Sequence, residues 1–274
     1  VQHDLGWIER AHERGWDVLL DAAAFTPTNC LDLSQHKPDF VALSFYKIFG
    51  YPTGIGALLA RRDHIGKLRR PWFAGGTITV ATVSPNRHFL HDGSEAFEDG
   101  TIDYLNLPAV EIGLKYIEQV GVDVIHDRVI ALTGWLLDQL TALHHSNGAA
   151  LLRVYGPVTT EGRGGTISLN FYDPDGVIID YRRLEQLANE HNISLRSGCF
   201  CNPGAGETAL GLTEAELSAA LEEDQRMTLP ELMTVLGRVL GALRISVGIA
   251  SNFADVYQFV QFARTFIDRP AESI

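Results

Sequence analysis

The chain has 274 residues, and 34 acidic side chains against 22 lysines and arginines give it a net charge of −12 at pH 7. This charge, without a basic stripe, argues against a protein that binds nucleic acid or an anionic membrane surface. No apolar run approaches the roughly 20 residues that cross a bilayer, and three cysteines are too few for a disulfide framework, so we expect a cytoplasmic protein with no membrane segment.

The first half of the chain alternates helix-like and strand-like segments, which predicts an α/β fold with a largely parallel sheet. Lys47 lies in the glycine-rich loop between two predicted strands, and Asp21 ends an earlier apolar run. Ligands bind beyond the carboxyl ends of such strands, so both side chains are expected to project into one cleft. The predicted helix and strands are 4–15, 17–24, 39–45 and 55–60.

The second half predicts a smaller α/β lobe. A long helix is expected to start near Asn106 and Pro108, an asparagine cap followed by a first-turn proline. One buried helical face is predicted by Leu132, Leu136, Leu140 and Leu143. Strands are predicted at 151–156, 166–171 and 242–248, and helices near 180–190, 213–222 and 229–241. The last predicted helix has Val256, Phe259, Val260, Ala263 and Ile267 on one face.

The strongest candidate site combines Asp21, Ser44, Lys47 and the segment LRSGCFCNPGAG at 195–206. Pyridoxal 5′-phosphate (PLP) needs an amine for a Schiff base and a carboxylate that keeps its pyridine nitrogen protonated. Its phosphate needs hydroxyls or backbone N–H groups. Lys47, Asp21 and Ser44 have the chemistry for these tasks, and the alternative for Lys47 is a surface lysine on a connecting loop.

Other groups are weaker candidates. Cys199 and Cys201 form a C-x-C pair without a second cysteine pair, which is a poor zinc signature, so no metal site is predicted. Cys30 is expected to pack as a small residue. His144 and His145, at a helix end, are expected to be solvated.

Five separated motifs resemble, in the same order, those of class V aminotransferase-fold enzymes. They are D-x-A at 21–23, S-x-x-K at 44–47, PWFAGGTITVATVS at 71–84, FEDGTIDYL at 97–105 and RSGCFCN at 196–202. The last three resemble the cysteine desulfurase and selenocysteine lyase branch. GCFCNPGA, with RISVGIASNFADVYQFVQF at 244–262, is most similar to the NifS-like domain of molybdenum cofactor sulfurases. The resemblance runs to about residue 268 and implies the PLP-dependent transferase fold type I.

Matched position by position, the resemblance makes Lys47 the Schiff-base lysine and Asp21 the partner of the pyridine nitrogen. Ala23 would lie beside Asp21 in the cofactor site, and Ser44 would bind the phosphate. Thr101 would reach the phosphate of the partner subunit, which implies a homodimer.

The same matching implies the substrate contacts. Arg196 would clamp the substrate carboxylate with its planar fork of donors. Cys201 would be the nucleophile, with Cys199 as the alternative, and it must attack as a thiolate. The implied reaction takes sulfur from L-cysteine, leaves a protein persulfide and releases alanine.

The sequence departs from the family pattern in three places. Ala24 replaces a glutamine, Tyr46 replaces the histidine before the lysine, and only 20 residues precede Asp21 where the family has a long segment. We therefore expect the N-terminal part of the family domain to be absent. The expected lobes are 1–128, the remainder of the large PLP-binding lobe, and 129–274, the small lobe with the cysteine loop.

The leading functional prediction is a PLP-dependent cysteine desulfurase-like enzyme that passes sulfur to an acceptor protein or cofactor. One alternative is another class V reaction, by a lyase, epimerase or aminotransferase, although the paired cysteines argue against it. Another is a non-catalytic homologue that acts as a binding or dimerisation module.

Overall fold

The structure is a computed structural model that describes residues 3–198, 202–221 and 226–274. The chain divides into two compact units, residues 3–126 and 127–274, which are called the first and the second unit below. Among the residues described, no helix combines the length and apolar character that a membrane span requires.

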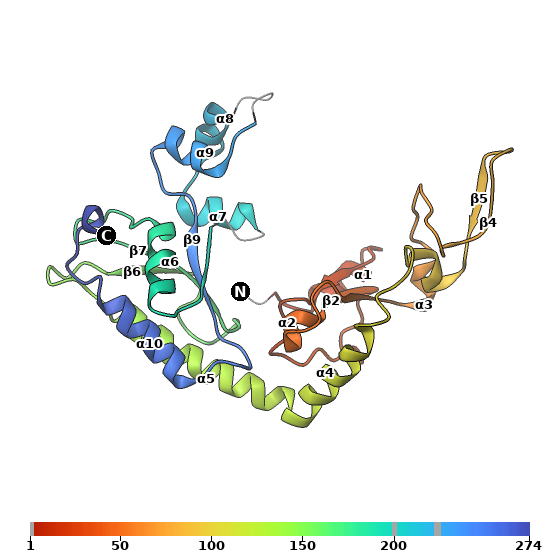
Figure 1. Cartoon of the computed structure of the whole chain (residues 1–274), viewed down its shortest axis with the longest axis horizontal. Coiled ribbons are helices and arrows are strands. Elements are labelled where there is room, and N and C mark those ends of the chain that lie inside the picture. Colours follow the sequence, from red (N-terminus) through yellow and green to blue (C-terminus); the bar gives the residue numbers. More distant parts are fainter. Residues whose placement is uncertain (1–2, 199–201, 222–225) are drawn as a thin grey trace. The chain divides into compact units, whose positions relative to one another are not determined.

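The first unit is built on a three-stranded sheet in the order β1–β2–β3 (Figure 1). β1 (Leu19–Asp21) pairs in parallel with β2 (Phe40–Ser44), and β3 (Gly56–Ala60) pairs antiparallel with β2. The strands predicted at 39–45 and 55–60 are thus confirmed. Of the largely parallel sheet that was predicted, the described part of this unit has one parallel pair, because the chain turns back over residues 45–55 and places β3 antiparallel beside β2.

Short helices flank this sheet. α1 (Trp7–His12) precedes β1, α2 (Phe45–Phe49) follows β2 without a break, and α3 (Arg62–Ile65) follows β3. The prediction that Lys47 lies in a loop is therefore wrong, because Lys47 is the third residue of α2. This helix ends at Gly50, whose φ of +85° favours glycine.

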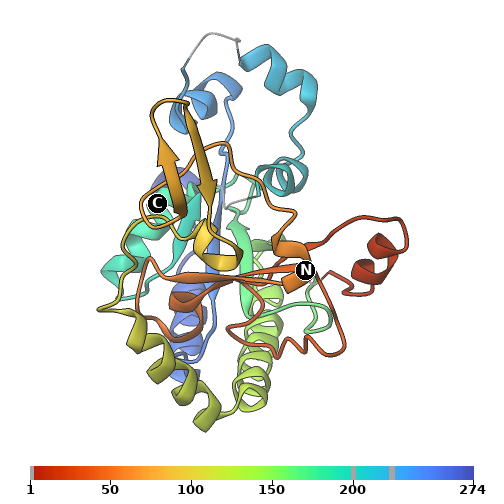
Figure 2. The same cartoon turned by 90° about the vertical axis from the view of Figure 1, so that its right-hand side faces the viewer.

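The rest of the first unit contains a hairpin and a long helix. β4 (Ile78–Thr82) and β5 (Arg87–Leu90) form a separate two-stranded ribbon, followed by the 3₁₀ helix η1 (Gly93–Phe97) (Figure 2). α4 (Leu107–Val120) has Asn106 at its N-cap and proline in its first turn, as predicted. The Asn106 amide does not cap the helix, because its Nδ2 donates to Asp103 and its Oδ1 accepts from the Tyr51 hydroxyl.

The second unit has a four-stranded antiparallel sheet in the order β6–β7–β9–β8. Its strands are β6 (Leu152–Tyr155), β7 (Thr166–Phe171), β8 (Arg196–Gly198) and β9 (Ala242–Ser246). Its helices are α5 (Val122–Thr141, which begins in the first unit), α6 (Tyr181–Glu190), α7 (Pro203–Leu210), α8 (Glu214–Ala220), α9 (Leu229–Leu236), α10 (Phe253–Arg264) and the 3₁₀ helix η2 (Ala271–Ser273).

The core of the second unit lies between one face of this sheet and helices α5 and α10. Of the four leucines predicted for one helical face, Leu132, Leu136 and Leu140 are buried on α5; Leu143 is buried too, but it lies beyond the end of the helix at Thr141. Along β7, the fully buried Ile167, Leu169 and Phe171 share one face of the sheet, and the Phe171 ring meets Phe266 at 5.5 Å. α5 and α10 run alongside each other (Figure 1). The ring centres of Trp135 of α5 and Phe253 of α10 are 4.8 Å apart.

Two predicted helix ends lie elsewhere. α9 ends at Leu236 rather than near 241, because Gly237 takes a left-handed conformation with φ +62°. α10 ends at Arg264, so Ile267 lies beyond it, half-buried, and Phe266 fills the core in its place.

Candidate active site

Asp21, Ser44 and Lys47 lie at one edge of the first sheet. Asp21 is the last residue of β1, Ser44 is the last residue of β2, and Lys47 follows one turn later in α2. β1 and β2 are parallel neighbours with Asp21 opposite Ala42, so their carboxyl ends meet at the same edge. The structure thus places at one edge of the sheet the three residues that sequence analysis selected as cofactor ligands.

Lys47 is presented by the packing of its own short helix. Ile48 is buried, and the ring of Phe49 lies so close to α4 that a Cβ on Gly113 would meet it at 2.4 Å. These two side chains hold α2 against the unit, and Lys47 lies on its exposed side. Lys47 has no ion-pair partner among the residues with described positions, so its amine is available to a ligand.

The Asp21 carboxylate is held by its own turn. Its Oδ1 accepts the backbone N–H of Ala23 at 3.0 Å. Ala23 therefore orients Asp21 through its backbone, and its methyl group adds no polar contact. Asp21 is exposed and, within the described ranges, is not paired with a cation. Its carboxylate can therefore accept a hydrogen bond from a protonated nitrogen of a ligand.

Two further predicted motif segments meet in the first unit. The N–H of Gly100 donates to the carbonyl of Gly75 at 2.8 Å. Arg70 joins the same segments, because it pairs with Asp99 at 2.5 Å and donates to the carbonyl oxygens of Trp72 and Ala96. These contacts hold the loop of Thr101, whose side chain is exposed.

The remaining predicted site residues belong to the second unit. Arg196 begins β8 and is exposed, and its position is directly opposite Arg244 of β9. Cys199 and Cys201 lie outside the described residues. α7 begins directly after this cysteine segment, where the Asn202 side chain caps it by accepting the N–H of Ala205.

Arg244 is a candidate functional residue that sequence reasoning did not select. It lies directly opposite Arg196 in the register of β8 and β9, so the two residues share one face of the sheet. The signal available in the sequence was the alternation in ALRIS (242–246), where Leu243 is buried and Arg244 points to the other face. The register that brings it beside Arg196 was not visible there.

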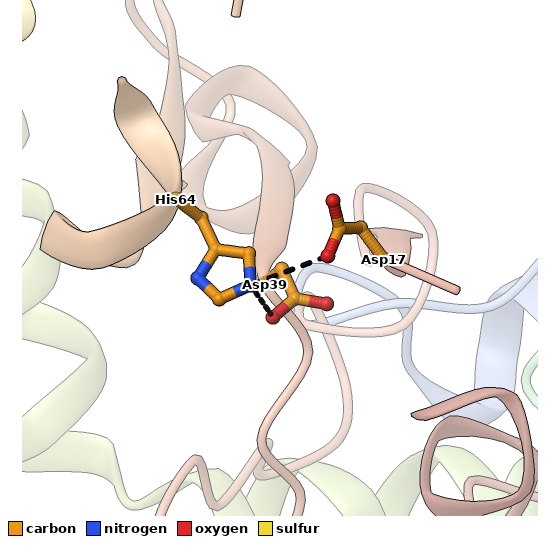
Figure 3. Close-up of side chains that lie close together, drawn as sticks. All are labelled: Asp17, Asp39 and His64. Carbon is orange, nitrogen blue, oxygen red and sulfur yellow. Dashed lines mark ion pairs between the residues drawn. The ribbon is translucent and has the colours of Figure 1, made fainter. Parts of the chain in front are cut away.

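A charged cluster in the first unit centres on the buried Asp39. His64 Nε2 lies 3.0 Å from Asp39 and 3.2 Å from Asp17, as Figure 3 shows. Asp39 also accepts from His12 Nε2 and from the N–H of Val18, both at 2.8 Å.

Asp17, Asp39 and His64 offer ligand atoms close enough together for a metal ion, and cationic side chains also pair with both carboxylates. Lys67 lies 2.7 Å from Asp17, and Arg61 lies 3.5 Å from Asp39. Burial raises the pKa of Asp39, but hydrogen bonds from Val18 and His12 and the charges of His12 and His64 outweigh burial, so the net pKa is lowered. The cluster therefore acts as an ion-pair network that ties α1 and α3 to the start of β2.

Two predictions outside the site are wrong. Cys30 is exposed rather than packed. His145 is buried rather than solvated, because its Nε2 bonds to the carbonyl of Tyr172 and its Nδ1 accepts the N–H of Asp268.

The chain is similar to known proteins both in sequence and in fold. Molybdenum cofactor sulfurase of Solanum lycopersicum is 39% identical over 256 residues, which are 93% of this chain and 31% of that protein. Cysteine desulfurase of Thermococcus onnurineus NA1 superimposes with a TM-score of 0.69 at 23% identity, over 94% of this chain and 54% of that one. A variant of C-DES, solved with glycine covalently linked to its PLP cofactor, gives a TM-score of 0.66 at 16% identity, over 96% of this chain and 56% of that one.

The chain therefore spans about a third of the length of the curated relative and about half of each solved chain. The structural matches establish the α/β fold of PLP-dependent transferases of fold type I. The family model of class-V aminotransferases matches residues 4–259, and the chain belongs to that family.

Proposed function

We propose that this chain carries out PLP-dependent sulfur transfer from L-cysteine, in the manner of cysteine desulfurases and molybdenum cofactor sulfurases. The observation that carries the proposal is the position of Lys47 and Asp21 at the carboxyl edge of a parallel strand pair. Both side chains are exposed, and neither forms an ion pair with another described residue. An uncommitted amine and carboxylate at this edge are what PLP requires.

Three residues of the first unit would hold the cofactor. Lys47 would bind it covalently, Asp21 would keep its ring nitrogen protonated, and Ser44 would donate its hydroxyl to the phosphate. When bound, PLP withdraws electrons from the α-carbon of an amino acid. The Ala23 N–H supports this arrangement because it fixes the carboxylate of Asp21.

One residue of the second unit would bind the amino acid. Arg196 begins β8 and is exposed, and a substrate carboxylate would accept from its guanidinium group. Ser197, next to Arg196, donates to Glu185 of α6 at 2.6 Å, which anchors the edge strand β8 to the body of the unit.

The sulfur would be taken by a cysteine of the segment between β8 and α7. We assign the nucleophile to Cys201, with Cys199 as the alternative. Its thiolate would attack the sulfur of L-cysteine and form an S–S bond as the substrate's Cβ–S bond breaks. The electron pair of the broken bond would stay with the substrate, whose β-carbon takes up a proton, so that a persulfide is left on the protein and alanine is released. The persulfide would then pass to an acceptor protein or cofactor.

The setting of the reaction is part of the proposal. The few cysteines support a reducing cytoplasm. The Thr101 loop, held by Gly75 and Arg70, supports a homodimer in which Thr101 reaches the cofactor of the other subunit.

The test is to add PLP to the purified chain, remove the free cofactor and record the visible absorption. The unchanged chain and Lys115→Ala should retain a visible band, whereas Lys47→Ala should not. Lys115 is a matched control because it is an exposed lysine of the first unit, 2.5 Å from Glu111. L-cysteine should then yield alanine and a persulfide on the protein.

The other outcomes select the alternatives. Bound PLP without sulfur release would indicate another class V reaction, such as that of a lyase, epimerase or aminotransferase. No bound PLP in the unchanged chain would favour a non-catalytic binding or dimerisation module.

A further inference from the structure

The sheet of the second unit has a polar face opposite its core. Tyr155, Ser168, Arg244 and Arg196 occupy one row across β6, β7, β9 and β8, because each is paired directly with the next. Residues in such a row share a face. With strands about 4.8 Å apart, Tyr155 lies about 14 Å from Arg196 across the sheet. The Tyr155 end of the face is therefore distinct from the proposed carboxylate site.

A cavity of about 490 Å³ opens at this far end of the face. Its walls are Arg153 and Tyr155 of β6, Tyr172 just after β7, and the C-terminal ends of α7 and α9. Arg238 closes the helical wall, because it donates to the carbonyl of Leu210 at 2.6 Å and pairs with Glu216 at 3.3 Å. The charge of Arg238 is thus compensated within the protein.

Arg153, in contrast to Arg238, is held by an aromatic ring and not by a carboxylate of the described residues. It is exposed, and its guanidinium lies 5.5 Å from the centre of the Tyr155 ring. In the described part of the chain it has no carboxylate partner. Stacking on an aromatic ring holds the planar group in place and leaves its N–H donors free for an anion.

The two tyrosines line the cavity beside Arg153. The buried Asn170 donates from Nδ2 to the Tyr155 hydroxyl at 3.1 Å and to the carbonyl of Gly241 at 3.0 Å, so Tyr155 is held in place from the sheet. Burial, followed by a hydrogen bond with Tyr172, raises the pKa of Tyr155 to about 12. A tyrosine hydroxyl can donate to an oxyanion, so Tyr172 is a second polar group of the cavity wall.

We propose that this cavity is a second anion-binding site, in which Arg153 and the Tyr172 hydroxyl bind the oxyanion group of a small phosphate- or carboxylate-bearing ligand. Arg153 is opposite Asn170, so Tyr172 is its diagonal neighbour on the same face and both can reach one group. The site needs neither the cofactor nor the cysteine segment, so it goes beyond the proposed sulfur transfer.

The test is isothermal titration calorimetry of the full chain with inorganic phosphate and, separately, with acetate. The background is the double variant Ser44→Ala and Arg196→Gln, which weakens the anion contacts of the proposed active site. In this background Arg153→Gln should weaken binding of the preferred anion by about tenfold or more, as expected for a lost charge-assisted contact. Tyr172→Phe should weaken it less, and Arg264→Gln, an exposed arginine of α10, should leave it unchanged.

Each result decides the proposal. Tighter binding of phosphate or of acetate identifies the group that the site prefers. Equal affinity with and without Arg153, or no heat with either anion in the double-variant background, would overturn the site. If Arg153→Gln changes the melting temperature, Arg153→Lys provides a second variant, which should bind with intermediate affinity because it keeps the charge but not the fork. Because no PLP is added, failure of sulfur transfer has no bearing on the result.

Discussion

The two units bury their apolar side chains to very different degrees. All of the largest fully buried side chains among the described residues belong to the second unit, from Val129 to Phe266. The first unit instead exposes large apolar groups on every part of its chain, including Trp16, Val83 and Leu105 at 69%, 96% and 80% exposure. The residues proposed to hold PLP thus lie on the unit with the smaller core.

This difference shows which forces hold each unit together. The second unit depends on packing between its sheet, α5 and α10. The first unit depends more on polar contacts, of which the Asp39 network is the most connected. Buried apolar area stabilises in proportion to its size, so the two units should respond differently to the same kind of change.

The largest expected effect is a core truncation in the second unit. Leu136→Ala should lower the free energy of unfolding of that unit by about 3–5 kcal/mol, because Leu136 is fully buried and a cavity would remain. Ile48→Ala in the first unit should cost only about 2 kcal/mol, because Ile48 lies on a five-residue helix that can readjust.

The measurement is urea unfolding followed by tryptophan fluorescence. Trp135 is the tryptophan of the second unit and contacts Phe253, whereas Trp7, Trp16 and Trp72 of the first unit are more than half exposed. Trp135 therefore reports the second unit. The stability of the first unit is measured by its proteolysis, which reports the effect of Ile48→Ala. Equal losses of unfolding free energy for Leu136→Ala and Ile48→Ala would contradict the difference in core size.

A somewhat smaller effect is expected from PLP. At a free concentration 100 times its Kd, a ligand stabilises the unit that binds it by about 2.7 kcal/mol. Hydrogen exchange should therefore slow in β1 and β2 and stay unchanged in β6 and β7. Lys47→Ala should remove the effect, and equal slowing in both units would mean that PLP stabilises more than the first unit.

Much of the fold was accessible from the sequence because local patterns determine it. β7 lies at the predicted residues 166–171, and α4 starts at the predicted Asn106 cap. The apolar alternation and the leucine spacing required no knowledge of distant contacts. α2 was missed because its five residues form a helix only by packing Ile48 and Phe49 inward, which is a tertiary effect.

The candidate site divides in the same way. Asp21 and Lys47 could be selected because each comes at or just after the end of an apolar run, and Ser44 because of its hydroxyl and its place in S-x-x-K; the parallel pairing then places them at one edge. Arg244 could not, because its place beside Arg196 depends on the register of two strands that are far apart in sequence. His145 was misjudged for a similar reason, since its partners Tyr172 and Asp268 come from distant segments.

A smaller loss is expected from Asp39→Asn in the first unit. The amide would leave His12, His64 and Arg61 without their shared carboxylate, and we expect a loss of about 2 kcal/mol, since the partners are partly exposed to solvent. The matched control is Asp63→Asn, an exposed neighbour that also pairs with Arg61, which should cause no measurable change. Thermal unfolding of both variants measures the two losses. Equal losses would show that the buried carboxylate of Asp39 stabilises the first unit no more than the exposed carboxylate of Asp63.

The smallest effect separates the units by pH. The pKa of Asp39 is below its ordinary 3.8 in the folded chain, so its contribution to stability is present above pH 3.8 and is lost as the pH falls through the folded pKa. Asp173 of the second unit behaves alike: burial raises its pKa, but N–H donors from Ala271, Val177 and Asp175 outweigh burial and lower the pKa overall.

Each substitution should therefore flatten the acid side of the stability profile of its own unit only. For Asp39→Asn we expect a weaker dependence below pH 4 when proteolysis of the first unit is followed, with Trp135 unfolding unchanged. For Asp173→Asn the pattern should be reversed. If either substitution flattened both profiles, the two units would unfold as one, and the difference in their cores would not translate into separate stabilities.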